Sequence, residues 1–343
     1  MTYESPRPFG WRPQAGAIHM SADPRFYDVC NGDADGLCSI LQWRFHAPAP
    51  ATLVTGLKRE IELLERVQAS AGDEVLVCDL SMQRNRRALL RLLDQGARVR
   101  YFDHHAVAGI PLHPQLETHV ELGSEVCTSL LMDRHLGGAF RAWALVGAYG
   151  DNLTGVADGI AEGLGLARQD RARLRMLGEA INYNAYGDDE HDVHIAPARL
   201  YEVLSRYRDP LDLLVHESIG QQLDALRGAD LQQAASVPAH WQDGRASVHL
   251  LPDAPWSRRV IGCLANELAS TQPNMAHAVL KPVRSDGYVV SVRAPLSAPG
   301  GANELCKRFG GAGRAAAGGI DHLPERDLPR FIAEFAAARW APV

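Results

Sequence analysis

Short apolar runs alternate with amphipathic segments along the first hundred residues of the chain. Runs of strand length and segments with helical periodicity follow one another at residues 26–30, 37–45, 51–55, 60–69, 74–78, 86–95 and 98–102. The run at 74–78 is apolar almost throughout, as in a parallel strand that is buried on both faces. Strands that alternate with helices in this way predict an α/β domain built on a doubly wound parallel sheet.

The pattern changes twice in the rest of the chain. Helical periodicity with glycine-rich joints extends from residue 127 to about 183, and a second helical stretch covers 202–235 with a break near Pro210. Strands and helices of a smaller α/β unit follow at 246–251, 258–270, 276–283, 288–293 and 328–340, with a hairpin turn at 285–287 and a glycine-rich loop at 310–319.

These changes, in a chain of 343 residues, indicate two domains. We predict an irregular N-terminal arm, a larger α/β domain, a helical linker and a smaller α/β domain, over residues 1–24, 25–200, 201–237 and 238–343 respectively. A cleft is expected between the two domains, because ligands often bind where domains meet.

Composition and charge narrow the classes of function. The chain has 46% hydrophobic and 22% charged residues, which is typical of a globular protein. Its 35 basic and 41 acidic residues give a net charge of −6, which argues against wide electrostatic binding to duplex nucleic acid or to an anionic membrane. No apolar run reaches the ~20 residues of a membrane span. Six cysteines without a Cys-x-x-Cys pair, and an N-terminus without a signal-peptide pattern, predict a reduced, cytoplasmic protein.

Acidic residues follow three of the predicted strands. These residues are Asp33 and Asp35 after the first strand, Asp79 after the third, and Asp103, with His104 and His105, after the fourth. Any one of them alone is typical of a helix cap or a turn. Because the carboxyl ends of parallel strands meet at one edge of a sheet, however, we expect all of them to lie together. Clustered carboxylates with one or two imidazoles favour a Mn²⁺ or Mg²⁺ site.

Four motifs, in order along the chain, resemble those of a known family. They are the D-x-D-G loop Asp33-Ala34-Asp35-Gly36, the strand-terminal Asp79, the triplet Asp103-His104-His105, and Asp151 after the apolar segment 146–150. With these motifs the chain resembles the DHH phosphoesterase superfamily. That superfamily includes RecJ-type single-strand exonucleases, nanoRNases that also dephosphorylate pAp, cyclic-di-AMP phosphodiesterases, family II pyrophosphatases and exopolyphosphatases. The resemblance covers nearly the whole chain after the N-terminal arm.

The resemblance implies a two-metal site that hydrolyses phosphoester bonds. It assigns Asp33 and Asp79 to one ion and Asp35, Asp79, His104 and Asp151 to the other, with Asp79 bridging. The implied cofactor is a pair of Mn²⁺ ions, for which Mg²⁺ or Co²⁺ can substitute. Asp79, His104 and His105 are the implied catalytic residues. His105 either contacts the phosphate or protonates the leaving group, or else it orients His104.

The C-terminal part resembles the DHH-associated substrate-binding domain, whose hallmark is a strand ending in S-x-R before a GGGH-x-x-AAG loop. The corresponding segments here are Ser291-Val292-Arg293 and the loop at 310–319. The resemblance therefore implies substrate binding by Ser291, Arg293, Gly311 and Arg314. Two positions depart from the family pattern: Asn31 stands where many members have a metal-binding His, and Gly313 stands where the loop His is usual.

The sequence thus predicts a manganese-dependent phosphodiesterase or phosphatase that acts on nanoRNA, linear or cyclic dinucleotides, or pAp. The alternatives are an exopolyphosphatase and a catalytically degenerate nucleotide-binding protein. The expected partners are a short oligonucleotide or small nucleotide and a second copy of the chain, with neither duplex nucleic acid nor a membrane. The stretch 182–194, which holds tyrosines and an acidic run, is interpreted either as a lid that stacks on nucleobases or as a solvated interdomain loop.

Overall fold

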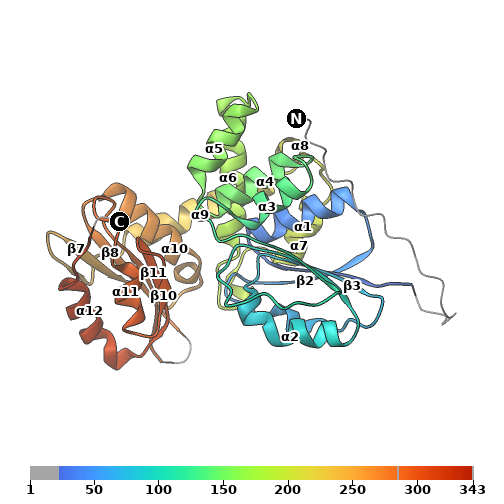
Figure 1. Cartoon of the computed structure of the whole chain (residues 1–343). Coiled ribbons are helices and arrows are strands. Elements are labelled where there is room, and N and C mark those ends of the chain that lie inside the picture. The colour runs from blue at the N-terminus through green and yellow to red at the C-terminus, as the bar shows by residue number, and fades with distance from the viewer. Residues whose placement is uncertain (1–22, 284–285, 342–343) are drawn as a thin grey trace, which may run out of the picture.

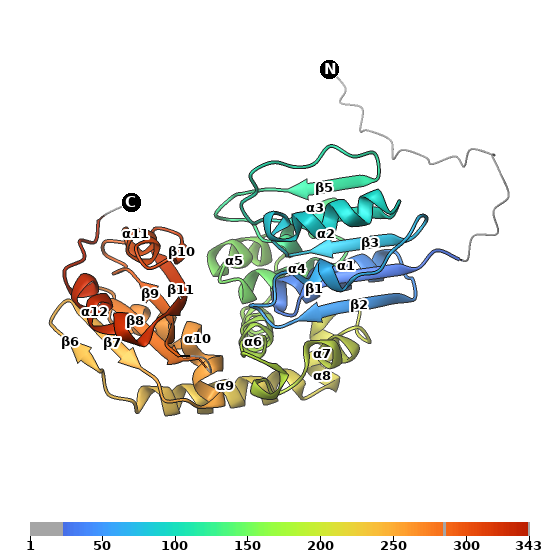
Figure 2. The same ribbon diagram turned by 90° about the horizontal axis from the view of Figure 1, so that it is seen from below.

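The computed structural model describes residues 23–283 and 286–341, so the predicted arm over 1–24 lies almost wholly outside the described part, as does Ser285 of the predicted turn. Two sheets form two lobes, and the helix α9 (Ile219–Ala235) runs from one lobe to the other (Figure 1, Figure 2). The first sheet is parallel throughout and the second is mixed. The predicted fold class is therefore confirmed.

Five strands form the first sheet in the order β2-β1-β3-β4-β5. They are β1 (Phe26–Asn31), β2 (Ala51–Gly56), β3 (Glu74–Cys78), β4 (Arg98–Asp103) and β5 (Leu116–Val120). The first four were predicted to within one residue at each end. The pattern does not predict β5, because it is an edge strand whose residues are all only partly buried and carry no continuous apolar run.

Helices cover both faces of this sheet, as a doubly wound fold requires (Figure 1). On one face α1 (Ala34–His46) packs with α3 (Thr128–His135) and α4 (Arg141–Gly150), and on the other lies α2 (Met82–Asp94). The side chains of Asp33 and Ser81 cap α1 and α2 respectively, because each accepts a hydrogen bond from a backbone N–H of the first turn. Each helix thus begins at the edge where the preceding strand ends.

The helix predicted over 60–69 is wrong, because this segment forms only one turn of 3₁₀ helix, η1 (Leu63–Arg66). The side chain of Asn85 on α2 bonds the backbone here. Its Nδ2 donates to the carbonyl of Ile61 at 2.7 Å, and its Oδ1 accepts from the N–H of Leu64 at 3.2 Å. These bonds use backbone groups that a longer helix would need for its own ladder. A contact from a residue more than twenty positions away overrides the local pattern.

The first lobe continues as helices. They are α5 (Thr154–Gly163), α6 (Arg168–Asn184), α7 (Pro197–Leu204) and α8 (Pro210–His216). The predicted helical character of 127–183 and the break near Pro210 are confirmed, since Pro210 is the first residue of α8. No helix in the described part of the chain is both long enough and apolar enough to span a lipid bilayer.

Six strands form the second sheet in the order β10-β11-β9-β8-β7-β6. They are β6 (Trp241–Gln242), β7 (Ala246–Leu250), β8 (Ala276–Pro282), β9 (Tyr288–Arg293), β10 (Ala312–Gly313) and β11 (Ala317–Leu323). On one face packs α10 (Pro255–Thr271), and on the other pack α11 (Ala302–Lys307) and α12 (Leu328–Ala336). The domain boundaries 25–200, 201–237 and 238–343 stay a proposal. Within the predicted linker, α8 and the end of α7 pack against the core of the first lobe, and α9 runs between the lobes.

The segment at 310–319, where the sequence predicts a loop, holds the short strand β10 and the start of β11 on either side of a turn. Gly313 of β10 pairs with Gly318 of β11. At Gly313 φ is +150°, and a Cβ atom would lie 2.4 Å from the carbonyl oxygen of Ala317. A side chain therefore does not fit at position 313 without moving the backbone.

Candidate metal centre and substrate cleft

The carboxyl ends of β1, β3 and β4 meet at one edge of the first sheet, and the predicted acidic residues gather there. A cavity of about 800 Å³ is lined on this side by Asp33, Lys58, Asp79, His104, His105 and Asp151. From the second lobe it is lined by Ala312, Gly313 and Arg314. The predicted cleft between the lobes is therefore present, and the candidate metal ligands lie at its base.

Asp33 is already paired in this arrangement. Its Oδ1 accepts from the N–H of Gly36 at 3.0 Å, and its Oδ2 lies 2.5 Å from the ammonium of Lys58. Burial by itself would raise the pKa of Asp33, but the charge and hydrogen bond of Lys58 outweigh it, so the pKa lies below its ordinary value. Asp33 is an ionised helix cap that a lysine neutralises.

Asp35, in the first turn of α1, bonds the start of α3. Its two carboxylate oxygens accept from the backbone N–H groups of Thr128 and Ser129, at 2.7 and 2.8 Å. These are the first two residues of α3, so the carboxylate caps that helix and faces its positive end. A carboxylate oxygen that accepts one such bond keeps a second lone pair. Asp35 is not among the residues that line the cavity, and its role as a metal ligand stays a prediction.

Asp79 occupies a strained position directly after β3. Its φ is +58°, in the left-handed region that few residues other than glycine adopt, and its side chain is buried. Burial raises its pKa well above the ordinary value, and the negative charges of Asp33 and Asp35 add to this effect. A buried carboxylate among other carboxylates is stabilised when a cation enters the group.

His104 is held with one ring nitrogen toward the carboxylates. Its Nδ1 lies 3.0 Å from the carbonyl oxygen of Val126, which can only accept, so the Nδ1 carries a proton. Its Nε2 lies 3.3 Å from Asp79 and 4.0 Å from Asp151. Burial lowers the pKa of His104, but the surrounding carboxylates outweigh burial and raise it to about 10. Burial and Asp35 raise the pKa of Asp151 to about 6.

His105 is oriented by Asp103, a role that the sequence reasoning did not assign. Asp103 is fully buried, and its Oδ1 lies 2.6 Å from the Nδ1 of His105 while it accepts from the backbone N–H groups of His104 and His105. Its Oδ2 accepts from the N–H of Met82 at the start of α2. His105 bonds Asp103, and His104 is oriented by the Val126 carbonyl rather than by His105. This geometry favours contact of His105 with the substrate over the other predicted role, the orientation of His104.

A divalent cation fits the group formed by Asp79, His104 and His105, and Asp151 lies 4.0 Å from the Nε2 of His104 at the edge of this group. Asp79, His104 and His105 offer ligand atoms that all lie within 4.8 Å of one another. Carboxylate oxygens with one imidazole nitrogen suit Mn²⁺ or Mg²⁺ better than a thiolate-preferring metal. The fit at Asp33 is poorer, because the Lys58 ammonium already lies on its Oδ2.

Only one of the four predicted substrate-binding residues is among those that line the cavity, and it is Arg314. Arg314 is exposed, and among the described residues its guanidinium makes no ion pair. Arg293 instead bonds within its own lobe, to Asn266 at 2.8 Å and to Ser291 at 3.0 Å. Gly311 packs against backbone, where a Cβ would lie 2.2 Å from the carbonyl of Gly319. Substrate binding by these three stays a prediction.

The stretch 182–194 lies between the two lobes, and some of its side chains pack there. Tyr183 is fully buried and donates to Asp230, so its ring is closed to a nucleobase. Asp188 pairs with Lys281 of β8 at 2.5 Å and with Arg258 of α10 at 3.2 Å. In the acidic run Asp188, Glu190 and His191 are exposed, as expected of a solvated interdomain loop, and Asp188 also joins the second lobe to the first by ion pairs. The interpretation as a lid stays a prediction.

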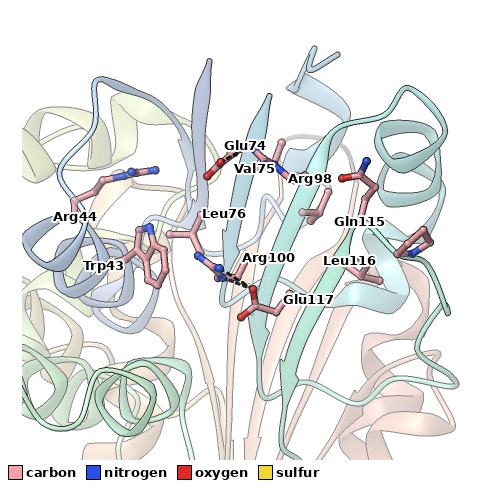
Figure 3. A pocket seen from close by; sticks show the side chains of 12 residues that line it. Trp43, Arg44, Glu74, Val75, Leu76, Arg98, Arg100, Gln115, Leu116 and Glu117 are labelled. Atoms are coloured by element: carbon pink, nitrogen blue, oxygen red, sulfur yellow. Dashed lines mark hydrogen bonds and ion pairs between the residues drawn. The ribbon is translucent and has the colours of Figure 1, made fainter. Parts of the chain in front are cut away.

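A second hollow, of about 400 Å³, lies on the α1 face of the first sheet, at the amino ends of its strands (Figure 3). Its arginines are neutralised by carboxylates: Arg44 lies 2.6 Å from Asp28, and Arg100 lies 2.7 Å from Glu117. Arg100 also lies over the ring of Trp43, 4.3 Å from its centroid. Because its positive charges are paired, this hollow is a weaker phosphate site than the cleft between the lobes.

Comparison by sequence finds no family model that matches the chain and no significant match among curated proteins. Comparison by structure finds similarity over nearly the whole chain. An exonuclease RecJ bound to manganese has a TM-score of 0.53 and 19% sequence identity, covering 92% of this chain and 90% of that one.

Two further solved structures are similar over comparable lengths. A pGpG-specific phosphodiesterase, PggH from Vibrio cholerae, has a TM-score of 0.52 and 14% identity, covering 91% of this chain and 99% of its own. An exopolyphosphatase-related protein from Bacteroides fragilis has a TM-score of 0.51 and 12% identity, covering 92% of each chain. Similarity at these identities establishes the fold. The fold that the resemblance of the motifs implies is therefore confirmed.

Proposed function

We propose that this protein is a divalent-metal-dependent hydrolase of phosphoester bonds. The observation that carries the proposal is a single cavity lined by Asp79, His104 and Asp151 from one lobe and by Arg314 from the other. The first group suits a hard cation, and the guanidinium suits a phosphate. Proteins named as an exonuclease and as a pGpG phosphodiesterase share the fold, which supports the same class of reaction.

The proposed metal is manganese, with Mg²⁺ or Co²⁺ as substitutes, held by Asp35, Asp79, His104 and Asp151. A similar RecJ structure contains manganese, which supports this choice. When bound, such an ion polarises a phosphoryl oxygen and lowers the pKa of a coordinated water. A second ion on Asp33 and Asp79, which the resemblance implies, would share the Asp33 carboxylate with the Lys58 ammonium.

The chain's own residues supply proton transfer and orientation. Asp103 holds the Nδ1 of His105, which leaves the Nε2 to protonate a leaving oxygen in the cavity that His105 lines. Burial lowers the pKa of His105, but Asp103 and Asp79 outweigh burial and raise it, which favours the protonated form that an acid needs. Arg314 is exposed and is placed to bind a phosphate of the substrate away from the reacting one.

The proposed substrates are short: nanoRNA, linear or cyclic dinucleotides, or pAp. A cavity of about 800 Å³ accommodates a few nucleotides at most. A chain with a net charge of −6 lacks the many basic contacts by which proteins hold extended strands. The pGpG specificity in the name of PggH supports a dinucleotide.

A second candidate, an exopolyphosphatase, is supported by the similar structure from Bacteroides fragilis, which is described as exopolyphosphatase-related. Its substrate has no base, so Arg314 would then bind a bridging or terminal phosphate. The two candidates differ in whether nucleosides are needed for turnover. We keep the nucleotide substrate first, because the glycine-rich β10–β11 segment beside Arg314 corresponds to the nucleotide-acting subtype.

The test is a hydrolysis panel with Mn²⁺, Mg²⁺ or Co²⁺ and with pGpG, pApA, pAp, cyclic di-AMP, polyphosphate and a single strand of thirty nucleotides. We expect turnover of dinucleotides or pAp with Mn²⁺, none with a chelator, and slower turnover of the long strand at equal concentration of ends. The control is Asp79→Asn, which keeps the shape of the side chain and removes the charge that binds metal. Faster turnover of polyphosphate would support the exopolyphosphatase. No turnover of any substrate, with metal bound, would support the degenerate binding protein.

A further inference from the structure

Lys58 is the one basic residue that lies among the candidate metal ligands in the cavity. Its Nζ is 2.5 Å from Asp33 Oδ2 and 2.8 Å from Asn182 Oδ1, and its side chain is 23% exposed against 3% for Asp33. We infer that the Lys58 ammonium takes the place of one of the two cations that the resemblance implies, so that the site binds a single divalent ion. This inference rests on the proposed function, and it concerns the number and position of the ions.

Lys58 is held by hydrogen bonds at its backbone and at its ammonium group. Its backbone N–H donates to the carbonyl of Ala185 at 2.9 Å, and its own carbonyl accepts from the Nδ2 of Asn31 at 3.4 Å. The Nζ then bonds both Asp33 and Asn182, the latter on α6. A side chain that swings away to admit a metal would break all the bonds of its ammonium group. Lys58 is therefore a built part of the site.

The neighbouring residue Asn31 offers the first ion a weaker ligand than the family pattern does. It stands where many members of the superfamily have a metal-binding histidine, and it is 7% exposed. Its Oδ1 has no hydrogen-bond partner among the described residues. An amide oxygen is a weaker ligand than an imidazole for Mn²⁺. The chain thus lacks one expected ligand of the first ion and places a positive charge on another, Asp33.

Electrostatics oppose a second divalent ion while Lys58 stays in place. The ion would share the Asp33 carboxylate with the ammonium, so that two cations would lie a few ångström apart in a buried group where screening is weak. Lysine is also an unusual choice in this chain, which has three lysines among its 35 basic residues. A compact ammonium occupies the volume of an ion, whereas the wide guanidinium of arginine does not.

The ammonium also has capacity left for the substrate. Lysine has three N–H donors, and Asp33 and Asn182 use two of them. Because Lys58 lines the cavity, the third donor is available to a phosphoryl oxygen. Lys58 would then stabilise the negative charge of the reacting phosphate, as a metal in that position does, without supplying a coordinated water.

The test measures bound manganese rather than activity. Mn²⁺ per chain is determined after equilibrium dialysis, and the electron paramagnetic resonance spectrum shows whether the ions are isolated or exchange-coupled. All variants carry His135→Ala, because Glu117, His119 and His135 offer a second set of ligand atoms within 4.8 Å of one another that could bind an adventitious ion. We expect one uncoupled ion per chain with Lys58 present.

Removing the ammonium should open the second position. In Lys58→Ala, Asp33 Oδ2 and the unpartnered Asn31 Oδ1 become available, and we expect binding to rise from one to two ions with a coupled spectrum. Asn31→His combined with Lys58→Ala should bind the second ion more tightly. The matched control is Arg59→Ala, which removes the adjacent basic residue, whose partner Asp321 is 93% exposed, and should leave one ion bound. Lys58→Met, which fills the same space without charge, replaces Lys58→Ala if the latter does not fold.

Two coupled ions in the protein with Lys58 present would overturn the inference, and so would one ion in both Lys58 variants. The proposed function fails in a different way. If the chain with one bound ion hydrolyses no substrate of the panel, the function is wrong and the single-ion inference stands. If the chain binds two ions and hydrolyses dinucleotides, the inference is wrong and the function stands.

Discussion

At the scale of single residues, the site is defined by the contacts that fix each ionisable group. His104 and His105 are adjacent in the chain, but one is fixed by a backbone carbonyl and the other by the buried Asp103. Their free ring nitrogens are therefore assigned to different tasks. A carboxylate that holds an imidazole in one tautomer also stabilises its protonated form.

Asp103→Asn tests this assignment of His105. We expect kcat to fall by about ten- to a hundredfold, because the amide neither fixes the tautomer nor stabilises the protonated ring. The loss of activity at high pH should shift to lower pH in a profile of kcat, since the raised pKa of His105 depends on Asp103. Mn²⁺ binding measured by dialysis should stay nearly unchanged. A large loss of metal with an unshifted profile would show that Asp103 supports the ligands instead.

Glu117 offers a prediction about acid stability that does not involve the cleft. The hydrogen bond from His119 and the charge of Arg100 lower its pKa to about 2, from an ordinary value of 4.5. A lowered carboxyl pKa stabilises the fold fully above pH 4.5, and this stabilisation is lost as pH falls toward 2. The Glu117 side chain is 42% exposed, so we expect its ionised form to add no more than about 1 kcal/mol to the free energy of unfolding.

The measurement is the free energy of unfolding in urea, for the unaltered chain and for Glu117→Gln, between pH 6 and pH 3. We expect the unaltered chain to be more stable at pH 6 and the difference to shrink as pH falls below 4.5. A difference that stays constant over this range would mean that the contribution of Glu117 does not depend on its charge.

At the scale of elements, the short β10–β11 pair positions Arg314 on the far wall of the cleft. Gly313 and Gly318 lie opposite each other, and the N–H of Arg314 donates to the carbonyl of Ala317 at 2.8 Å. The tight pair leaves Arg314 exposed at its turn. A backbone without side chains at these positions lets the strands approach closely, and the position of the arginine follows from that approach.

Gly313→Ala should open this pair. A Cβ atom at residue 313 would meet the Ala317 carbonyl at 2.4 Å and would adopt an unfavourable φ, so we expect a loss of at least about 1–3 kcal/mol in the free energy of unfolding and a raised KM. The matched control is Gly310→Ala, at which φ is +76° and no atom lies within 4 Å of the added carbon. It should show only the backbone cost of about 1–2 kcal/mol, with KM nearly unchanged. Equal KM values for the two variants would show that the β10–β11 pair does not position the substrate contact.

At the scale of the whole molecule, the cleft exists because two lobes are held at a fixed separation. The helix α9 runs between them (Figure 2). The ion pairs of Asp188 with Arg258 and Lys281 attach the second lobe to the end of the first. One lobe holds the carboxylates and the other holds an unpaired guanidinium. Metal binding and substrate binding should therefore be separable by mutation.

Arg314→Ala tests that separation. A lost charge-assisted hydrogen bond is worth roughly 1.5–3 kcal/mol, or about ten- to a hundredfold in kcat/KM. We expect most of the loss in KM, because a contact with a remote phosphate is made in both the ground state and the transition state. The loss should be large for pGpG or pAp and small for bis-p-nitrophenyl phosphate, which has no remote phosphate. An equal loss of kcat/KM on both substrates would show that Arg314 takes part in the chemical step or supports the fold.

The sequence by itself determined the parallel sheet and the edge at which its acidic residues gather. Apolar runs of strand length, each followed by an aspartate, are local features, and the shared direction of parallel strands brings their ends together without further information. For this reason Asp33, Asp79 and the Asp103-His104-His105 triplet could be assigned to one site from their spacing along the chain. Asp151, which follows a helix rather than a strand, was placed there only by the resemblance.

Only the tertiary structure decided which partners these residues have. Lys58, which follows β2, reaches Asp33 at the end of the neighbouring strand β1. Asn85 prevents the helix predicted over 60–69, and Asp188 pairs with residues seventy or more positions away. Such contacts depend on how helices and lobes pack, and no local period or motif encodes them. The charge balance of the metal centre, and with it the number of ions, is therefore a property of the folded chain, because it depends on which side chains packing brings together.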